Sequence, residues 1–299
     1  MKVRMSTTSG VSSAQEHDEL PGVSPESLVV KTLEPRRGFS SLGVRESLTR
    51  VDLLAMLIRR ELKLRYTQTL LGPLWVIVNP LVPALLFTFV FTRVVRIETT
   101  GISYLLLVTT AMAPWTLFSR SLTRGGGSLI AERHLLTKVY FPRLLIPLAM
   151  VLASIVDLVV SVVIAMCTYH SSGGRVTLRL LALPAVAAWA LAVSFAFTIF
   201  FAGLSVRRRD LVNALPFLLQ VWLYLSPVAY PLTAVPIHLR SVIHINPLTS
   251  VVQGFQWCLT GRTTMPIIDL ATGIALTGAS LAIGLVVFSI GQRAVADVL

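Results

Sequence analysis

Long apolar runs separated by short polar stretches dominate the chain after residue 46. Most of these runs reach roughly 18 residues or more, the length at which an α-helix crosses a hydrocarbon layer of ~30 Å. They do not alternate with the period of 2 that is typical of membrane β-barrel strands. The pattern predicts an all-α integral membrane protein with six transmembrane helices, at about 71–91, 103–118, 144–168, 180–204, 211–230 and 267–290.

Composition agrees with this interpretation. Hydrophobic residues make up 54% of the chain and charged residues only 13%, against about 25% charged residues in soluble domains. The net charge of +12 comes from basic residues at the ends of the apolar runs, not from one soluble face. We therefore expect no nucleic-acid partner.

The distribution of Lys and Arg predicts the orientation, because cytoplasmic loops carry the excess of these residues. With the N-terminus inside, the inner side receives about twice as many as the outer side. We expect a multi-pass protein of the inner (plasma) membrane with both termini cytoplasmic. The run Arg207, Arg208, Arg209 and Asp210 is then a tight cytoplasmic turn between the fourth and fifth spans.

Residues 1–46 are polar and lack the apolar core of a signal peptide, so we expect a disordered cytoplasmic tail. Residues 47–69 follow with apolar positions on one side of a helical wheel and charged positions on the other. This pattern predicts an amphipathic helix lying in the inner interface. Its role is either a simple anchor or a site for entering phosphate-bearing lipid head groups, bound by Arg59, Arg60, Lys63 and Arg65.

A second amphipathic segment lies within "GGGSLIAERHLLTKVYFPR", residues 125–143. The glycines break the second span, Ser128 is a helix cap, and Pro142 ends the helix. We expect a cytoplasmic helix at 128–141 that docks on a soluble partner. A phosphate-binding loop is not expected, because the pattern GxxxxGK[ST] does not occur in the sequence.

Four ordered segments resemble the permease subunits of the ATP-binding-cassette exporters of O-antigen, teichoic acid, capsule and galactan. They are "RYTQTLLGPLWVIVNPL" (65–81), "LLTKVYFPRLLIPL" (135–148), "RRDLVNALPFLLQVWLYLSPVAYP" (208–231) and "INPLTSVVQGFQWCLTG" (245–261). One departure is Leu144, where this family often has an acidic residue. The resemblance implies that residues 70–299 form a six-span permease domain.

The resemblance also implies the partners. Two copies of the chain would pair with two copies of a separate ATPase, which would bind ATP and Mg²⁺, so this chain would be a transport subunit without a cofactor or catalytic residues. The cargo would be a lipid-linked polysaccharide. Coupling to the ATPase would fall to the second amphipathic segment and the turn at 207–210, through Glu132, Arg133, His134, Lys138, Arg209 and Asp210.

A sliding sugar polymer suits aromatic faces and exchangeable amide hydrogen bonds. Family likeness places the first and fifth spans along the conduit. The candidate path residues are Trp75, Asn79, Gln220, Trp222, Tyr224 and Tyr230. An interfacial aromatic belt also explains Trp75 and Tyr230, and interhelical hydrogen bonds also explain Asn79 and Gln220.

Prolines shape the region before the last span. Pro216 bends the start of the fifth span, whereas Pro227 and Pro231 end it. Residues 232–265 are too broken for a full span but contain two short apolar stretches, 237–243 and 248–259. We expect a re-entrant hairpin at the outer face, which is tolerated where it faces protein or water.

Asp157 is an acid within the third apolar run and is expected to have a partner, with Ser154 and Ser161 as neighbours for a structural hydrogen bond. Cys167 and Cys258 lack metal-ligand spacing, so we expect free thiols and no metal site. Two other functions stay open. One is a related exporter permease for a drug, haem or lipid. The other is a membrane glycosyl- or acyltransferase, for which no cluster of acids or histidines is evident.

Overall fold

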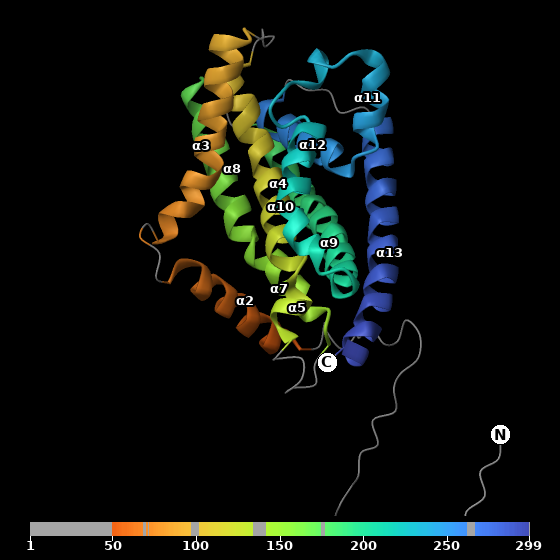
Figure 1. Cartoon of the computed structure of the whole chain (residues 1–299). Coiled ribbons are helices and arrows are strands. Elements are labelled where there is room, and N and C mark those ends of the chain that lie inside the picture. Colours follow the sequence, from red (N-terminus) through yellow and green to blue (C-terminus); the bar gives the residue numbers. More distant parts are fainter. Residues whose placement is uncertain are drawn as a thin grey trace, which may run out of the picture. The chain divides into compact units, whose positions relative to one another are not determined.

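The structure of the chain, a computed structural model, consists of helices joined by turns and short loops over the residues that it describes: 50–67, 70, 72–96, 102–133, 142–174, 177–261 and 267–298. No strand occurs in those ranges (Figure 1). The prediction of an all-α protein is therefore confirmed for the described part. The expected tail at 1–46 and residues 134–141 of the expected docking helix lie outside it.

Four helical segments are long and apolar enough to cross a membrane. The segment Gly72–Val94 consists of η3 (Gly72–Leu74), α3 (Trp75–Phe89) and η4 (Val90–Val94). The other three are Leu145–Ser171, Leu178–Arg207 and Ile268–Gln292. Their helices are α7 (Leu145–Ala153), α8 (Ile155–Ser171), η5 (Leu178–Ala182), α9 (Leu183–Arg207) and α13 (Ile267–Val298).

The two remaining predicted spans differ from their expected bounds. Helix α4 runs over Tyr104–Gly125 for 22 residues, well beyond the predicted end at residue 118. Helix α10 covers only Asp210–Leu225, 16 residues, or about 24 Å at 1.5 Å per residue. It stops early because Ser226 precedes Pro227 and adopts an extended conformation. Length and composition therefore identify four candidate spanning segments, and the count of six stays a prediction.

Helix α4 is the most buried long helix in the described part of the chain. The hydroxyls of Thr109 and Thr116 bond to carbonyls of their own helix, which hides them from an apolar environment. They also meet α8, at 2.9 Å from Thr168 and 2.9 Å from Ser161 respectively. These hydroxyls lower the apolarity of α4 without exposing polar groups.

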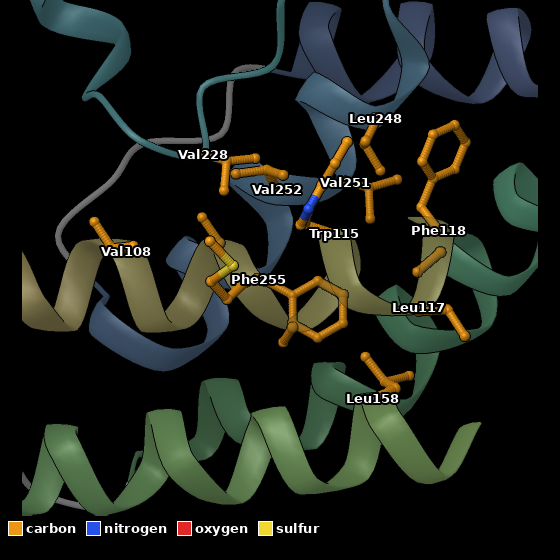
Figure 2. Close-up of a cluster of buried hydrophobic side chains, with 14 of the residues drawn as sticks. Val108, Trp115, Leu117, Phe118, Leu158, Val228, Leu248, Val251, Val252 and Phe255 are labelled. Atoms are coloured by element: carbon orange, nitrogen blue, oxygen red, sulfur yellow. The ribbon is translucent and has the colours of Figure 1, made fainter. Parts of the chain in front are cut away.

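The main core forms where α4 packs against α12 (Pro247–Thr260). Figure 2 shows Trp115 and Phe118 of α4 in one cluster with Val251 and Phe255 of α12. Leu158 of α8 and Val228, in the loop after α10, complete the same cluster. A deeply buried α12 is thus central to the packing.

Helices α11 (Ile237–His244) and α12 lie where the sequence predicted two short helices. The α12 helix has defined ends: the Asn246 side chain accepts a hydrogen bond from the Leu248 N–H at 3.1 Å, and Gly261 ends the helix with φ = 65°. Asn246 also donates to the Ser226 hydroxyl at 2.8 Å. This bond ties the start of α12 to the end of α10.

Helices α9 and α13 make the most extensive contact between any two described helices. Glycine permits the close approach. A Cβ on Gly203 would lie 2.6 Å from the Cα of Phe288, and a Cβ on Gly284 would lie 2.5 Å from the carbonyl oxygen of Ala196. Small residues that let backbones touch are typical of packed membrane helices.

Adding one methyl group at Gly284 should therefore destabilise the protein. We expect Gly284→Ala to lower the stability by about 1–3 kcal/mol through overpacking. A Cβ on Gly278 of the same helix would meet no atom within 4 Å. Gly278→Ala should be neutral or stabilising by up to about 1 kcal/mol. Thermal midpoints of the purified variants in detergent check this, and equal shifts for both would contradict the close-packing account.

Candidate functional site

One side of α10 is exposed along its length. Residues three or four apart form this face: Asn213, Phe217, Gln220, Val221 and Tyr224. The opposite side packs on α4 and α9. Phe217 is 67% exposed and Tyr224 55% exposed. Two predicted path residues, Gln220 and Tyr224, thus share one accessible face of mixed apolar and polar character.

Trp222 does not lie on that face. Its ring centroid is 5.2 Å from that of Phe118 and 4.8 Å from that of Phe197, in edge-to-face contacts. A residue two positions from Gln220 and Tyr224 points to the other side of a helix, because neighbours on one face are three or four apart. Trp222 packs α10 onto α4 and α9, and its role in the substrate path stays a prediction.

Helix α3 also exposes a long apolar face. It packs on α4 and α8 but leaves large side chains uncovered: Trp75, Ile77, Val82, Leu85, Leu86 and Phe89. The Asn79 amide donates to the carbonyl of Trp75 at 2.6 Å, so it bonds within its own helix. Pro83 has no N–H to give the carbonyl of Asn79.

Two tyrosines join the ends of these elements. The Tyr230 hydroxyl donates to the carbonyl of Tyr224 at 2.8 Å, at the end of α10. The Tyr104 hydroxyl at the start of α4 donates to the carbonyl of Ala229, and its ring stacks on Phe91 of η4 at 5.7 Å. Tyr230 therefore has a structural contact, and Tyr104 links the ends of the α3 segment and the α10 segment.

A group of charges lies where α2 (Val51–Tyr66) meets the long helices. The Arg65 guanidinium is 2.5 Å from the Asp157 carboxylate, and both side chains are less than 10% exposed. Glu61 is 3.9 Å from Arg65 and 3.5 Å from Arg124 of α4. Glu61, Arg65, Arg124 and Asp157 are named the charge cluster below. It joins α2 to α4 and α8.

The partner of Asp157 differs from the expected one. Ser154 and Ser161 bond backbone carbonyls, those of Met150 and Asp157. The carboxylate instead bonds Arg65, which the sequence had suggested for lipid head groups. A break at Ser154 separates α7 from α8, so Asp157 lies in the first turn of α8 and not in the middle of one continuous helix.

The other suggested head-group residues have different surroundings. Arg59 and Lys63 are exposed on α2. Arg60 pairs with Glu132 at 2.9 Å, just after α5 (Ser128–Ala131). The structure thus brings a suggested head-group residue together with a suggested coupling residue.

The remaining coupling candidates are only partly described. Arg133 is exposed, as are Arg209 and Asp210 at the turn between α9 and α10. His134 and Lys138 lie outside the described residues. The glycines before α5 serve packing: a Cβ on Gly126 would lie 2.7 Å from Leu215 of α10. Figure 1 shows α2, α5 and α7 at the end of the structure where α13 finishes.

Comparison with known proteins shows which family this chain belongs to. Residues 52–260 match the model of the family described as ABC-2 type transporter. This chain belongs to the ABC-2 type transporter family. A Myxococcus xanthus protein named O-antigen export system permease protein RfbA is 32% identical over 215 residues, which cover 71% of this chain and 82% of that protein. A Klebsiella pneumoniae protein of the same name is 29% identical over 236 residues, 78% of this chain and 90% of that protein.

The ABC-2 match extends from α2 to the end of α12, and so includes both exposed faces and the charge cluster. Sequence reasoning missed Arg124 and Tyr104 as contributors. The available signal was an acid at 157 within an apolar run, which required a cation from elsewhere. The sequence did not indicate which cation this would be, since Arg65 lies 92 residues from Asp157.

Removing one member of the buried pair should be costly. We expect Asp157→Leu to destabilise the protein by about 3–5 kcal/mol, because Arg65 would stay buried without its main partner. The double variant Arg65→Met with Asp157→Leu should recover most of this loss. As a control, Arg60→Gln breaks a pair in which Arg60 is 44% exposed and should cost no more than about 1 kcal/mol. Thermal midpoints equal for the single and double variants would contradict the pairing.

Proposed function

We propose that this chain is the permease subunit of an ATP-driven exporter that moves a lipid-linked cell-surface polysaccharide across the inner membrane. The path runs along the exposed faces of α3 and α10. The observation that carries the proposal is the match to permeases named for O-antigen export over more than two thirds of the chain. The mixed surface of α10 supports it, since Gln220 and Tyr224 offer an amide and an aromatic ring beside apolar side chains.

The proposed topology has six spans, with α4 and α10 added to the four apolar segments. Helix α4 has 22 residues, about 33 Å, and its neighbours cover its hydroxyls. The end of the structure that holds α2 and α5 is the cytoplasmic side. Support comes from the basic residues at that end, which include Arg59, Arg60, Lys63, Arg124 and Arg207. Both termini are cytoplasmic, and α11 with α12 forms the re-entrant outer segment.

A second copy of the chain covers the faces of α3 and α10 in the proposed assembly. Exposed apolar faces of this extent are typical of contact with lipid or with another protein. In a two-fold dimer the same surfaces meet on both copies. The residues along α3 and α10 then border a passage between the protomers.

The energy comes from a separate ATPase subunit, which binds ATP and Mg²⁺. Its proposed docking surface is formed by the segment around α5 and the turn between α9 and α10, including Arg133, Arg209 and Asp210. Arg60–Glu132 connects this surface to α2, and Arg65–Asp157 connects α2 to α8. Movement at the docking surface therefore has a direct physical route to a spanning helix.

Path variants test the proposed transport role. In cells that lack the native gene, Tyr224→Ala and Gln220→Ala should reduce surface glycan several-fold while the protein level stays normal, because each removes a contact on the accessible face. Val163→Ala changes an exposed apolar residue of α8 (54% exposed) and should leave export unchanged. Surface glycan and membrane-inserted protein are measured together. Normal export by a variant that combines Tyr224→Ala with Gln220→Ala would exclude this path.

The dimer is tested by cross-linking. In a Cys167→Ala background, cysteines at Val82 and Phe217 should give cross-linked dimers with a short bis-maleimide, because both positions lie on the faces assigned to the interface. Cys258 is buried and remains in place. A pair at Val163 and Ile283, exposed on α8 and α13, should remain monomeric. Cross-linking of the second pair alone would place the interface elsewhere.

A further inference from the structure

An apolar pocket of about 510 Å³ lies between the start of α9, the end of α12 and the start of α13. Its walls include Val186 and Trp189 of α9, Trp257 of α12, and Leu270 and Ile274 of α13. Pockets that hold small molecules have volumes of roughly 300–1,000 Å³ and mainly apolar walls. The pocket lies away from the exposed faces of α3 and α10.

The inner wall of the pocket is held by a defined contact. The Trp189 indole N–H donates to the Thr277 hydroxyl at 2.9 Å. Gly273 allows this ring to lie close to α13, because a Cβ there would be 2.7 Å from Trp189. The polar atom of Trp189 is therefore satisfied inside the protein, which leaves the ring as an apolar wall.

A cation stands at the rim. Arg179 is exposed, its guanidinium carbon lies 6.0 Å from the centre of the Trp257 ring, and it donates to the carbonyl of Gly261. In the 3₁₀-helix η5, Arg179 and the pocket residue Ala182 are three apart and so lie on one side. A guanidinium has five N–H groups, so donors remain for an anion.

The surroundings of the rim are apolar. Leu178, Leu181 and Ile268 are 74–85% exposed around the same helix starts. The spanning segments Leu178–Arg207 and Ile268–Gln292 both begin at this end. Exposed leucine and isoleucine at the end of spanning helices indicate contact with lipid. The pocket therefore opens toward the bilayer, with Arg179 at the level of the head groups.

We propose that this pocket binds one acyl chain of an anionic phospholipid and that Arg179 binds its phosphate. The assignment follows from an apolar pocket of limited volume with the cation Arg179 at its rim, beside an apolar surface. An arginine fork suits the oxygens of a phosphate group. Since α12 forms one wall, a bound lipid would hold α12 against α9 and α13. The proposal depends on the spans and not on the identity of the exported substrate.

Native mass spectrometry of the purified, delipidated chain tests this site. Phosphatidylglycerol and diacylglycerol, which has acyl chains but no phosphate, are titrated separately, and the affinity for the first bound lipid is compared. Arg179→Gln should weaken phosphatidylglycerol binding about fivefold, as expected for an exposed charge pair, and leave diacylglycerol binding unchanged. Ala185→Phe, which fills the pocket, should weaken both lipids. Arg93→Gln, an exposed arginine at η4, is the matched control and should change neither.

Two further measurements complete the test: thermal unfolding and competition by inorganic phosphate. Thermal unfolding shows whether Ala185→Phe stays folded, and Ala182→Leu is a smaller filling variant if it does not. Millimolar inorganic phosphate should fail to displace phosphatidylglycerol, because the acyl chain supplies most of the contact. The proposal is wrong if neither filling variant weakens lipid binding, if Arg179→Gln affects both lipids equally, or if phosphate alone competes.

Discussion

The buried contact between Arg65 and Asp157 constrains much of the structure. Neither charge is stable alone in an apolar interior, so each requires the other at short range. Arg65 belongs to α2 and Asp157 to the first turn of α8, and the contact therefore keeps an amphipathic helix docked midway along the segment Leu145–Ser171. Glu61 and Arg124 extend the same requirement to α4. The position of α2 is thus set by charge as well as by its apolar stripe.

That constraint has a functional consequence in the proposed exporter. Helix α2 reaches α5 through Arg60 and Glu132 on one side and α8 through Arg65 and Asp157 on the other. The exposed pair can exchange with water at little cost, whereas the buried pair cannot. Force applied near α5 would then displace α2 and α8 together. Helices α9 and α13 pack closely through glycine backbones.

Much of the architecture could be predicted from hydropathy, because a run that must cross hydrocarbon leaves a strong pattern. The ends of the helices and the directions in which their side chains face were harder to predict. Pro227 was expected to end the fifth span, and α10 does end at Leu225, five residues before the predicted bound at 230. Residue type alone did not indicate which way Trp222 faces, because a residue two positions from Gln220 points to another side of α10. By contrast, Gln220 and Tyr224 share a face, as spacing alone requires.

The pairing of Arg65 with Asp157 was beyond sequence reasoning, since 92 residues separate them and only the packing of α2 on α7 brings them together. The same holds for Tyr104 and Ala229, joined across 125 residues. Apolar patterns specify which face is buried but not which partner covers it. For that reason the sequence predicted that Asp157 has a partner but did not predict which residue it is.

Reconstitution tests the central claim most directly. The purified chain and its ATPase partner are placed together in liposomes that contain a lipid-linked polysaccharide, and accessible glycan is measured on the far side of the bilayer. The account predicts translocation that requires ATP and both polypeptides. Translocation without the ATPase would contradict it. So would ATP hydrolysis by the reconstituted complex with no movement of glycan.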